Sequence, residues 1–407
     1  MDKQYKFIIT SSILVLLTGC GLLSPAQDVD VYDDPVEMPE EPAESVEDME
    51  EVSEEEPEED PRNEVSFFAV GDNLIHSQIF NYAQIEDGIY DFKPIYMNFA
   101  DDIQNADLAF INQESIIGGD DLGFSGFPTF NTPSDMAENL VDLGFDIVVG
   151  SNNHSLDKQT AGVQNTLSYW AEFEDEVLFT GVFDSQEHRD EIPIVEVNGL
   201  TFSVLTYTYG TNGVIPEAPY QINYFDPELI TSDVMRAQEM SDFVIVAAHM
   251  GDEHSLSANH MQLDYAQLFA DLGVDLMMGS HSHTIQPIEW VTGENENETL
   301  VVYSLGNFLA STPSDINLLG GSLHLNFVEE NDEHFIDDVR FEPHLIHYEE
   351  EVEGDISTRT NFEIFKLNDY PNELAEKHAL NNFEDNIISV ENYQKIVEDV
   401  INAEFLK

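Results

Sequence analysis

The chain has 407 residues, enough for one large or two modest domains. Its 82 acidic residues against 13 Lys and Arg give a formal net charge of −69, which excludes the broad basic surface of a nucleic-acid-binding protein. A hydrophobic content of 42% is too high for a wholly disordered polyanion, and the single cysteine excludes a disulfide framework and any Cys-rich zinc or iron–sulfur site. Most of the chain is therefore expected to fold.

The N-terminus has the pattern of a secretory leader. Two lysines precede an apolar run over 7–17, about half as long as the ~20 residues of a spanning helix. The run ends in the sequence LTGC at 17–20, which resembles the lipobox of bacterial lipoproteins. That resemblance makes 1–20 a signal peptide and implies cleavage before Cys20 and lipidation of its thiol. The mature protein would then be extracytoplasmic and lipid-anchored to the cell membrane.

The segment 21–64 is rich in Asp, Glu and Pro. It contains too few apolar residues to offset the entropy of ordering, so we expect a disordered, self-repelling acidic linker. A stalk between the anchor and the fold is the favoured interpretation, and a plain low-complexity tail is the alternative. The remainder of the chain is also strongly acidic, which favours a salt-adapted bacterial source, because external salt screens the repulsion.

Strands and helices are predicted to alternate over 65–320. Asn198-Gly199 divides 192–209 into a hairpin. The pattern predicts a layered α/β domain, which a C-terminal part over 321–407 completes with strands and a helix. The other predicted strands lie at 65–70, 107–111, 145–149, 243–248, 274–278, 299–305, 322–328 and 335–341, and the predicted helices lie at 94–104, 133–143, 156–171, 227–240, 258–271 and 390–405.

Polar residues of the kinds that bind metals follow six of these strands or their loops. In layered α/β folds, ligands bind beyond the carboxyl ends of strands. Each residue alone is equally compatible with a cap or a turn, but their joint occurrence favours a shared site. Carboxylate, amide and imidazole groups without thiolate suit one or two ions of Mn, Fe or Zn. The candidate ligands are Asp72, Glu114, Asn153, His249, His281 and His283.

Two further histidine features bear on this site. His281 and His283 are two residues apart, so on a loop they can address two different ions, whereas on a regular strand both would point to one face. His154, next to Asn153, is left free to donate a proton or to stabilise an oxyanion.

The order of these motifs resembles the CapA family of poly-γ-glutamate capsule biosynthesis proteins, within the calcineurin-like metallophosphoesterase superfamily. The resemblance spans roughly 65–310. It implies a β-sandwich flanked by helices. The motifs that carry it are 69–76 (AVGDNLIH), 112–114 (NQE), 152–157 (NNHSLD), 249–253 (HMGDE), 279–283 (GSHSH) and 303–308 (YSLGNF).

The same resemblance assigns roles to residues. Glu114 is implied to bridge two ions and His154 to act as the acid. One ion would be held by Asp72, Glu114 and His283, and the other by Glu114, Asn153, His249 and His281.

The sequence departs from the superfamily pattern in its first motif. A second ligand, a His two residues after the Asp, is replaced by Leu74, and His76 is the candidate substitute, with the start of a solvent-facing helix as the alternative. The acidic residue that often follows the motif histidine is Ser155, which leaves Asp157 as the candidate orienting partner. The bridging residue is Glu instead of Asp. These departures leave open whether one or two ions bind.

Other polar residues in the motifs are candidate substrate contacts or supports of the ligands, with capping and turn formation as the alternatives. They are Asn73, Asn112, Asp252, Glu253 and Asn307. The histidines of the C-terminal part are expected to lie on the surface. They are His324, His334, His344, His347 and His378.

The resemblance implies a surface lipoprotein that acts in synthesis, export or processing of poly-γ-glutamate or a related envelope polymer, beside membrane synthetase subunits. The first hypothesis is a metal-dependent hydrolase or transferase that uses a metal-bound hydroxide. The second is a non-catalytic metal-binding accessory of a membrane complex. A secreted nucleotidase-type phosphoesterase is a third reading, for which no base-stacking aromatic pair is identified. A difficulty for the first hypothesis is that an acidic domain repels a polyanionic chain.

Overall fold

The computed structural model describes residues 6–7, 62–383, 386 and 388–406. The predicted signal peptide, the candidate lipidation site Cys20 and the predicted acidic linker lie outside these residues, apart from 6–7 and the last residues of the linker. Among the residues described, no helix combines the length and the apolar character that crossing a bilayer requires.

Most of the described strands belong to two large sheets, and β3 (Gln84–Glu86) with β4 (Ile89–Tyr90) forms a separate ribbon. The first sheet contains, in spatial order, β1 (Lys6–Phe7), β8 (Ile194–Val197), β9 (Leu200–Thr208), β10 (Phe243–His249), β11 (Leu276–Ser280), β13 (Glu298–Val302) and β12 (Ile288–Thr292). The second contains β17 (Arg359–Lys366), β16 (Glu333–Glu350), β15 (Leu319–Glu330), β2 (Asn63–Asn73), β5 (Leu108–Asn112), β6 (Ile147–Val149) and β7 (Leu178–Thr180), and β14 (Asn307–Leu309) also pairs with β2.

The centre of each sheet is parallel. In the first sheet β9, β10, β11 and β13 run in the same direction, and in the second sheet β2, β5, β6 and β7 do so. Antiparallel pairing adds the outer strands on both sides of the first sheet and on one side of the second, whose other edge is the parallel strand β7. Because parallel strands end at the same edge, the loops that follow these strands gather at one rim of each sheet.

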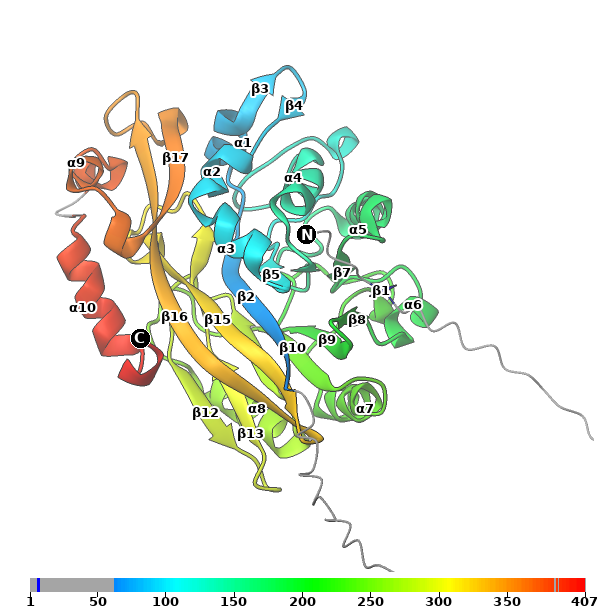
Figure 1. Ribbon diagram of the computed structural model, residues 1–407. Helices are drawn as coiled ribbons and strands as arrows, with labels where there is room; N and C mark the ends of the chain where they lie inside the picture. The colour runs from blue at the N-terminus through cyan, green and yellow to red at the C-terminus, as the bar shows by residue number, and fades with distance from the viewer. Residues whose placement is uncertain (1–5, 8–61, 384–385, 387, 407) are drawn as a thin grey trace, which may run out of the picture. The chain divides into compact units, whose positions relative to one another are not determined.

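Helices connect the parallel strands and cover the sheets (Figure 1). Each predicted helix before residue 300 is found, although 94–104 is divided by a 3-10 turn into two short helices. The helices are α1 (Ser77–Ala83), α2 (Lys93–Tyr96), α3 (Ala100–Asn105), α4 (Asp135–Leu143), α5 (Gln159–Trp170), α6 (Gln186–Asp190), α7 (Pro227–Gln238), α8 (His260–Leu272), α9 (Asn372–Ala375) and α10 (Val390–Val400).

The two sheets pack face to face through aromatic side chains. Phe327 of β15 lies in the second sheet, where its ring centroid is 5.4 Å from that of Phe67 on β2. The same ring is 5.0 Å from Phe202 on β9 and 4.8 Å from Phe243 on β10, both in the first sheet. All four side chains are buried in one continuous core. This core between the sheets holds the two parallel centres in a fixed relation.

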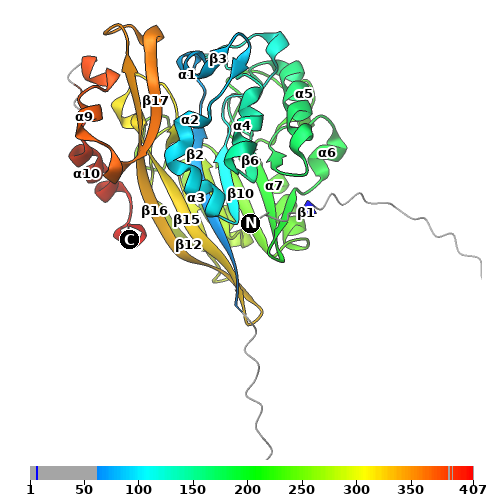
Figure 2. The ribbon, with the colours of Figure 1, turned by 45° about the horizontal axis from the view of Figure 1, so that its top comes forward.

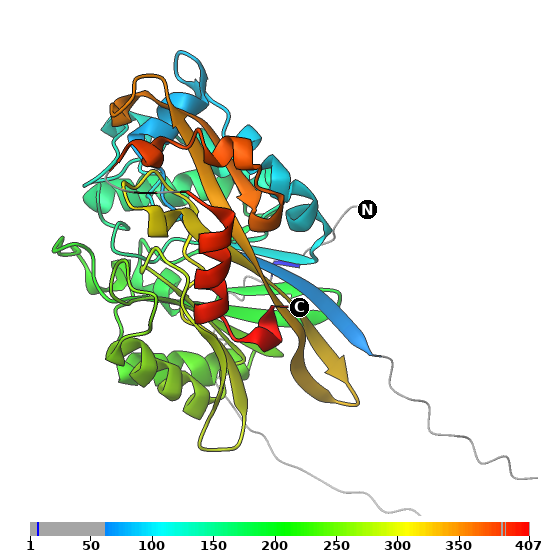
Figure 3. The ribbon, with the colours of Figure 1, turned by 90° about the vertical axis from the view of Figure 1, so that its left-hand side faces the viewer.

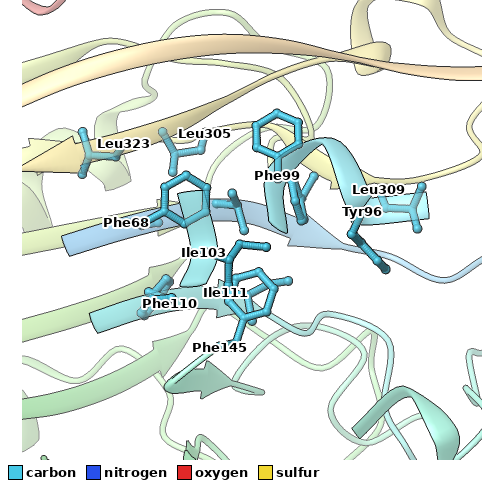
Figure 4. Packing of buried hydrophobic residues seen from close by; sticks show 14 of the residues in the cluster. Phe68, Tyr96, Phe99, Ile103, Phe110, Ile111, Phe145, Leu305, Leu309 and Leu323 are labelled. Carbon is cyan, nitrogen blue, oxygen red and sulfur yellow. The ribbon is translucent and has the colours of Figure 1, made fainter. Parts of the chain in front are cut away.

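Helices cover the outer faces of the sandwich. On the first sheet, Val234 of α7 and Phe269 of α8 belong to a separate buried cluster with β10 and β11. On the second sheet, Phe99 and Ile103 pack near Phe68, as Figure 4 shows. Figure 2 shows α2 and α3 lying against this sheet. The predicted layered fold, a β-sandwich flanked by helices, is confirmed.

The C-terminal part contributes strands to the second sheet instead of forming a separate layer. β15 pairs antiparallel with β2, and β16 and β17 continue the sheet outward. These strands are longer than the predicted segments 322–328 and 335–341, and β17 was not predicted. Helix α10 lies beside them (Figure 3), with Tyr393 and Val397 in the core.

The expectation that the C-terminal histidines lie on the surface is wrong for three of them. His344, His347 and His378 are buried, because β16 and the segment after α9 form part of the core. His344 Nε2 lies 2.9 Å from the carbonyl oxygen of Asn307, and His347 Nδ1 lies 2.7 Å from the hydroxyl oxygen of Tyr370. Burial lowers the pKa of His344 and of His347 to about 4 and that of His378 to about 3. These three histidines are neutral at physiological pH.

These pKa values predict a loss of stability in acid. An unfolded histidine titrates near pH ~6.5, so between about 6.5 and 4 the unfolded chain binds protons that the folded chain does not. The free energy of unfolding should therefore fall on acidification, by up to about 1.4 kcal/mol per pH unit for each such histidine. Urea titrations at pH 7.5, 6 and 5 measure this slope. His378→Gln should flatten it; equal slopes in the native and variant proteins would contradict the assignment.

Candidate metal centre

The residues predicted to bind metal converge where the two parallel centres end. Asp72, Glu114 and Asn153 follow or end β2, β5 and β6 of the second sheet. The first sheet supplies three histidines from β10 and from the loop after β11. All six side chains are buried, although they come from loops far apart in the sequence. The three histidines are His249, His281 and His283.

Asp72 joins the two sheets at this rim. Its Oδ2 atom lies 3.1 Å from Nδ1 of His283, and the backbone N–H of His281 donates to the same oxygen at 3.3 Å. Its Oδ1 atom accepts a hydrogen bond from Nδ2 of Asn112 at 2.8 Å. The carboxylate is therefore held in one orientation by groups from both sheets.

The carboxylate of Glu114 is the group of this site that most strongly indicates a bound cation. Both of its oxygens are buried without a hydrogen-bond partner; Nε2 of His249 and Nδ1 of His283 each lie 3.7 Å from one of them. Burial, together with the neighbouring charge of Asp72, raises the pKa of Glu114 well above its usual range. An ionised carboxylate in such surroundings is costly unless a cation compensates it.

The geometry around Glu114 fits a cation. One ligand atom each from Glu114, His281 and His283 lie within 4.8 Å of one another. Nδ1 of His281 is also buried without a hydrogen-bond partner. The carboxylate of Glu114 and the imidazole of His281 are thus close together, buried and without a hydrogen-bond donor. Carboxylate oxygen and imidazole nitrogen are ligand atoms that Mn, Fe or Zn binds. The residues present therefore fit a divalent ion.

His281 and His283 occupy backbone conformations that side chains rarely adopt. Both have positive φ, 97° at His281 and 57° at His283. Such conformations cost of order 1–3 kcal/mol and persist at functional sites when the surrounding structure holds them. The two residues lie on the loop that follows β11, not on the strand, so the loop arrangement of the two alternatives is the one observed.

Two of the three site histidines are held in the neutral form that binds metals. Burial lowers the pKa of His249 well below its usual range, and burial with the charge of His283 lowers that of His281 to about 3. Burial also acts to lower the pKa of His283, but the carboxylates of Glu114 and Asp72 outweigh it and raise this pKa to about 10. Cation binding at His283 would therefore release a proton.

Neighbouring polar groups orient the ligand candidates. His249 Nδ1 lies 2.7 Å from the hydroxyl oxygen of Ser280, and its Nε2 lies 2.9 Å from Oδ1 of Asn153. Asn307 Oδ1 lies 3.0 Å from Nδ1 of His283. Asn307 reaches this position because β14 lies directly against β2, where a Cβ on Gly71 would come within 1.9 Å of a carbonyl oxygen.

His154 and Asp157 form a buried pair. His154 Nδ1 lies 2.7 Å from Oδ2 of Asp157, which also accepts the backbone N–H of Phe130 at 2.6 Å. The Phe130 ring packs edge-on against the imidazole, with the centroids 4.6 Å apart. The carboxylate orients the ring, which is the arrangement expected of a positioned proton donor.

The structure does not place every predicted residue among the ligands. His76 precedes α1, and its Nδ1 lies 3.1 Å from the carbonyl oxygen of Leu74 and 3.3 Å from the backbone nitrogen of Ser311; none of its described hydrogen bonds is to Asp72 or Glu114. The side chain of Asn73 points into the core.

In the core, Asn73 donates to Gln113 at 2.7 Å and accepts from the hydroxyl of Tyr96 at 2.8 Å, so it supports the loop that carries Glu114.

Asp252 and Glu253 are exposed, in the loop that follows β10. The negative charge of Glu253 also acts to raise the pKa of Glu114, after burial and Asp72.

The loop after β9 contributes residues that were not predicted. The ring centroid of Tyr209 lies 4.5 Å from that of His281, and the Asn212 side chain contacts both Asn153 and His154. Reading 192–209 as a hairpin hid the fact that β9 is also parallel to β10 and ends at the same rim. The signal was present, because a polar run, 208–213, follows an apolar strand there as it does at the other site loops.

A second group of metal-ligand side chains is compensated without an ion. Asp102 of α3 lies close to His324 and Glu342 of the second sheet. Lys366 Nζ is 2.8 Å from a carboxylate oxygen of Asp102 and 2.9 Å from one of Glu342. The lysine ammonium thus pairs directly with both carboxylates, whereas neither oxygen of Glu114 has a hydrogen-bond partner.

The fold and the rim together define a helix-flanked β-sandwich with a carboxylate–imidazole site. The family described as "Bacterial capsule synthesis protein PGA_cap" matches residues 66–312, more than half of the chain. The chain therefore belongs to this family of capsule synthesis proteins, which confirms the CapA resemblance of its motifs.

Curated relatives include two CapA proteins. The chain is 29% identical over 180 residues to "PGA biosynthesis protein CapA" of Bacillus subtilis (strain 168), covering 42% of this chain and 44% of that protein. It is 25% identical over 175 residues to "Capsule biosynthesis protein CapA" of Bacillus anthracis, covering 41% of each chain. The aligned region thus spans less than half the length of either relative.

Similar solved structures include two bacterial proteins. One is described as a novel phosphatase from Mycoplasma pneumoniae, with 12% identity, a TM-score of 0.46, and coverage of 70% of this chain and 94% of that chain. The other is described as a putative 5'-nucleotidase from Staphylococcus aureus, with 14% identity, a TM-score of 0.42, and coverage of 68% and 54%.

Replacing the unpartnered carboxylate should have opposite effects on stability and on cation binding. In Glu114→Gln the cost of burying a charge is removed, so the cation-free protein should gain about 1–3 kcal/mol in its free energy of unfolding. The rise in Tm that Mn²⁺ produces in the native protein should disappear. Calorimetry with chelator and with Mn²⁺ measures both effects. The exposed Glu373→Gln variant on α9 is the control and should change neither; a less stable Glu114→Gln that still responds to Mn²⁺ would contradict this interpretation.

Proposed function

We propose that this chain is a surface lipoprotein that acts in poly-γ-glutamate synthesis, export or processing as a metal-dependent hydrolase or transferase. The observation that carries the metal-dependent part is the buried carboxylate of Glu114 without a protein partner. Membership of the capsule synthesis family and the names of the two CapA relatives support poly-γ-glutamate as the polymer.

The six ligand candidates at the rim would hold the ion or ions. Asp72, Glu114 and His283 form one group, and Asn153, His249 and His281 complete a second around the same Glu114. A divalent cation held there would supply Lewis-acid polarisation of a carbonyl or phosphoryl oxygen. Mn, Fe and Zn are the candidates from the donor set.

The chain's own residues would manage the proton and the position of the substrate. With Nδ1 of His154 turned to Asp157, the other ring nitrogen is the one available to protonate a leaving group. Tyr209, whose side chain is 41% exposed while its ring covers His281, would line the approach to the site.

The negative charge of the chain makes the proposed activity on a polyanionic polymer dependent on salt. A net charge of −69 repels a polyanionic polymer, and repulsion between exposed charges is screened over about 8 Å at physiological ionic strength and over about 3 Å at 1 M. Activity on poly-γ-glutamate should therefore rise with added salt. This is consistent with the salt-adapted source proposed from composition.

The proposed location rests on the sequence of the leader. Cleavage before Cys20 and lipidation would place the folded part outside the cytoplasm and tether it to the membrane, next to membrane synthetase subunits. The acidic segment before the fold would act as the spacer. Metabolic labelling with a palmitate analogue, lost in Cys20→Ala, tests the anchor.

Turnover with and without the His154 side chain tests the proposed reaction. Poly-γ-glutamate and a generic phosphodiester are incubated with purified protein, Mn²⁺ and added salt, and product length or phosphate ester cleavage is measured. His154→Ala should lower kcat by about 10²–10⁴ and retain the bound metal found by elemental analysis. His188→Ala is the matched control, because His188 pairs with Asp184 at 3.0 Å on an exposed helix. Absence of metal-dependent turnover in the native protein would overturn the enzymatic proposal.

A non-catalytic accessory is the second candidate, and Leu74 favours it. This buried apolar side chain stands where the superfamily's first motif has a histidine ligand, and His76 is hydrogen-bonded to the backbone instead. An accessory would support polymer formation in cells equally well with His154→Ala, whereas an enzyme would not.

A further inference from the structure

The loop that follows β9 is fixed against the candidate metal centre. β9 is parallel to β10, with Thr208 opposite His249. The next residue, Tyr209, donates its backbone N–H to the carbonyl oxygen of His249 at 3.0 Å. The chain after β9 therefore starts beside a ligand candidate and continues across the rim.

A tight turn then positions Asn212. The backbone N–H of Val214 donates to the carbonyl oxygen of Thr211 at 2.8 Å. The two central residues both have positive φ, 50° at Asn212 and 78° at Gly213, which is the pattern of a type I′ turn and its preferred Asn-Gly pair. The Thr211 hydroxyl, 2.8 Å from that of Tyr224, anchors the start of the turn. The turn is well defined although Asn212 itself is exposed.

The Asn212 carboxamide contacts two site residues at once. Its Oδ1 accepts a hydrogen bond from Nδ2 of Asn153 at 3.4 Å, and its Nδ2 lies 3.3 Å from Nδ1 of His154. On its other side, Oδ1 of Asn153 lies 2.9 Å from Nε2 of His249. A carboxamide has one oxygen end and one nitrogen end. Because Nδ2 of Asn153 donates to Asn212, the direction of Oδ1 of Asn153 is determined as well.

We propose that Asn212 is a positioning residue that keeps the carboxamide oxygen of Asn153 directed at the cation site, with His154 beside it. The oxygen is the end of a carboxamide that can bind a metal, so a rotated Asn153 would present its NH₂ group instead. Asn212 acts through Asn153 and is not a ligand itself. This inference rests on the proposed metal centre.

Three variants separate the side chain of Asn212 from its backbone. Asn212→Gly removes the carboxamide and tolerates the positive φ. Asn198→Gly is the matched control, because Asn198 is also exposed, has a φ of 52° and precedes a glycine, but lies in the β8–β9 hairpin at the opposite end of β9. Asn212→Asp keeps an acceptor oxygen at the same place.

The affinity for Mn²⁺, measured by calorimetric titration of the chelator-treated full chain, is the readout. Loss of a group that orients a metal ligand typically weakens binding by about 10–100-fold. We expect such a loss in Asn212→Gly, native affinity in Asn198→Gly, and affinity within about threefold of native or tighter in Asn212→Asp, where the Asn153 contact is retained.

Any other result would contradict either the role of Asn212 or the metal centre itself. Native affinity in Asn212→Gly, or an equal loss in Asn198→Gly, would overturn the role of Asn212 while leaving the metal centre intact. A loss in Asn212→Asp as large as in Asn212→Gly would do the same. A native protein that binds none of Mn²⁺, Fe²⁺ and Zn²⁺ would overturn the metal centre itself.

Discussion

The structure depends on one unusual electrostatic feature, the carboxylate of Glu114 enclosed by imidazoles and carboxyls with no donor of its own. Buried polar groups are otherwise hydrogen-bonded in folded proteins, and Asp72, a short distance away, is held by three donors or neighbours. Keeping Glu114 in this state requires the rest of the rim to be rigid. The sandwich core beneath it, through Phe327 and its partners, supplies that rigidity.

The rigid rim gives each polar residue a definite task. Hydrogen bonds orient the imidazole rings: Ser280 and Asn153 hold that of His249, Asn307 holds that of His283, and Asp157 holds that of His154. Apart from Asn307 on β14, these supports come from the same strand ends and loops as the ligand candidates, so the loops could not be exchanged independently. The positive φ of His281 and His283 is a further cost that the surrounding contacts maintain.

The sequence predicted the strand-end positions of these groups because parallel strands end together, and this rule needs only apolar runs and their following residues. It failed where a position depends on partners distant in the chain. The pairing of β9 with β10, and hence the role of Asn212, is a tertiary property, since a hairpin and a parallel strand share the same apolar pattern. The surface expectation for the buried histidines of β16 failed for the same reason, because which face of a strand is covered is decided by the other sheet or by α9 and α10.

The allocation of ligand candidates between the sheets has a mechanical consequence. Asp72, Glu114 and Asn153 belong to one sheet, and the three histidines to the other, so an ion bound by both sets would cross-link the two halves of the sandwich at their open end. Without an ion, the polar contacts between the two sets are those of Asp72 with His281 and His283 and of Asn153 with His249. Capture of an ion would thus join the two sheets directly at this rim, in addition to the apolar core between them.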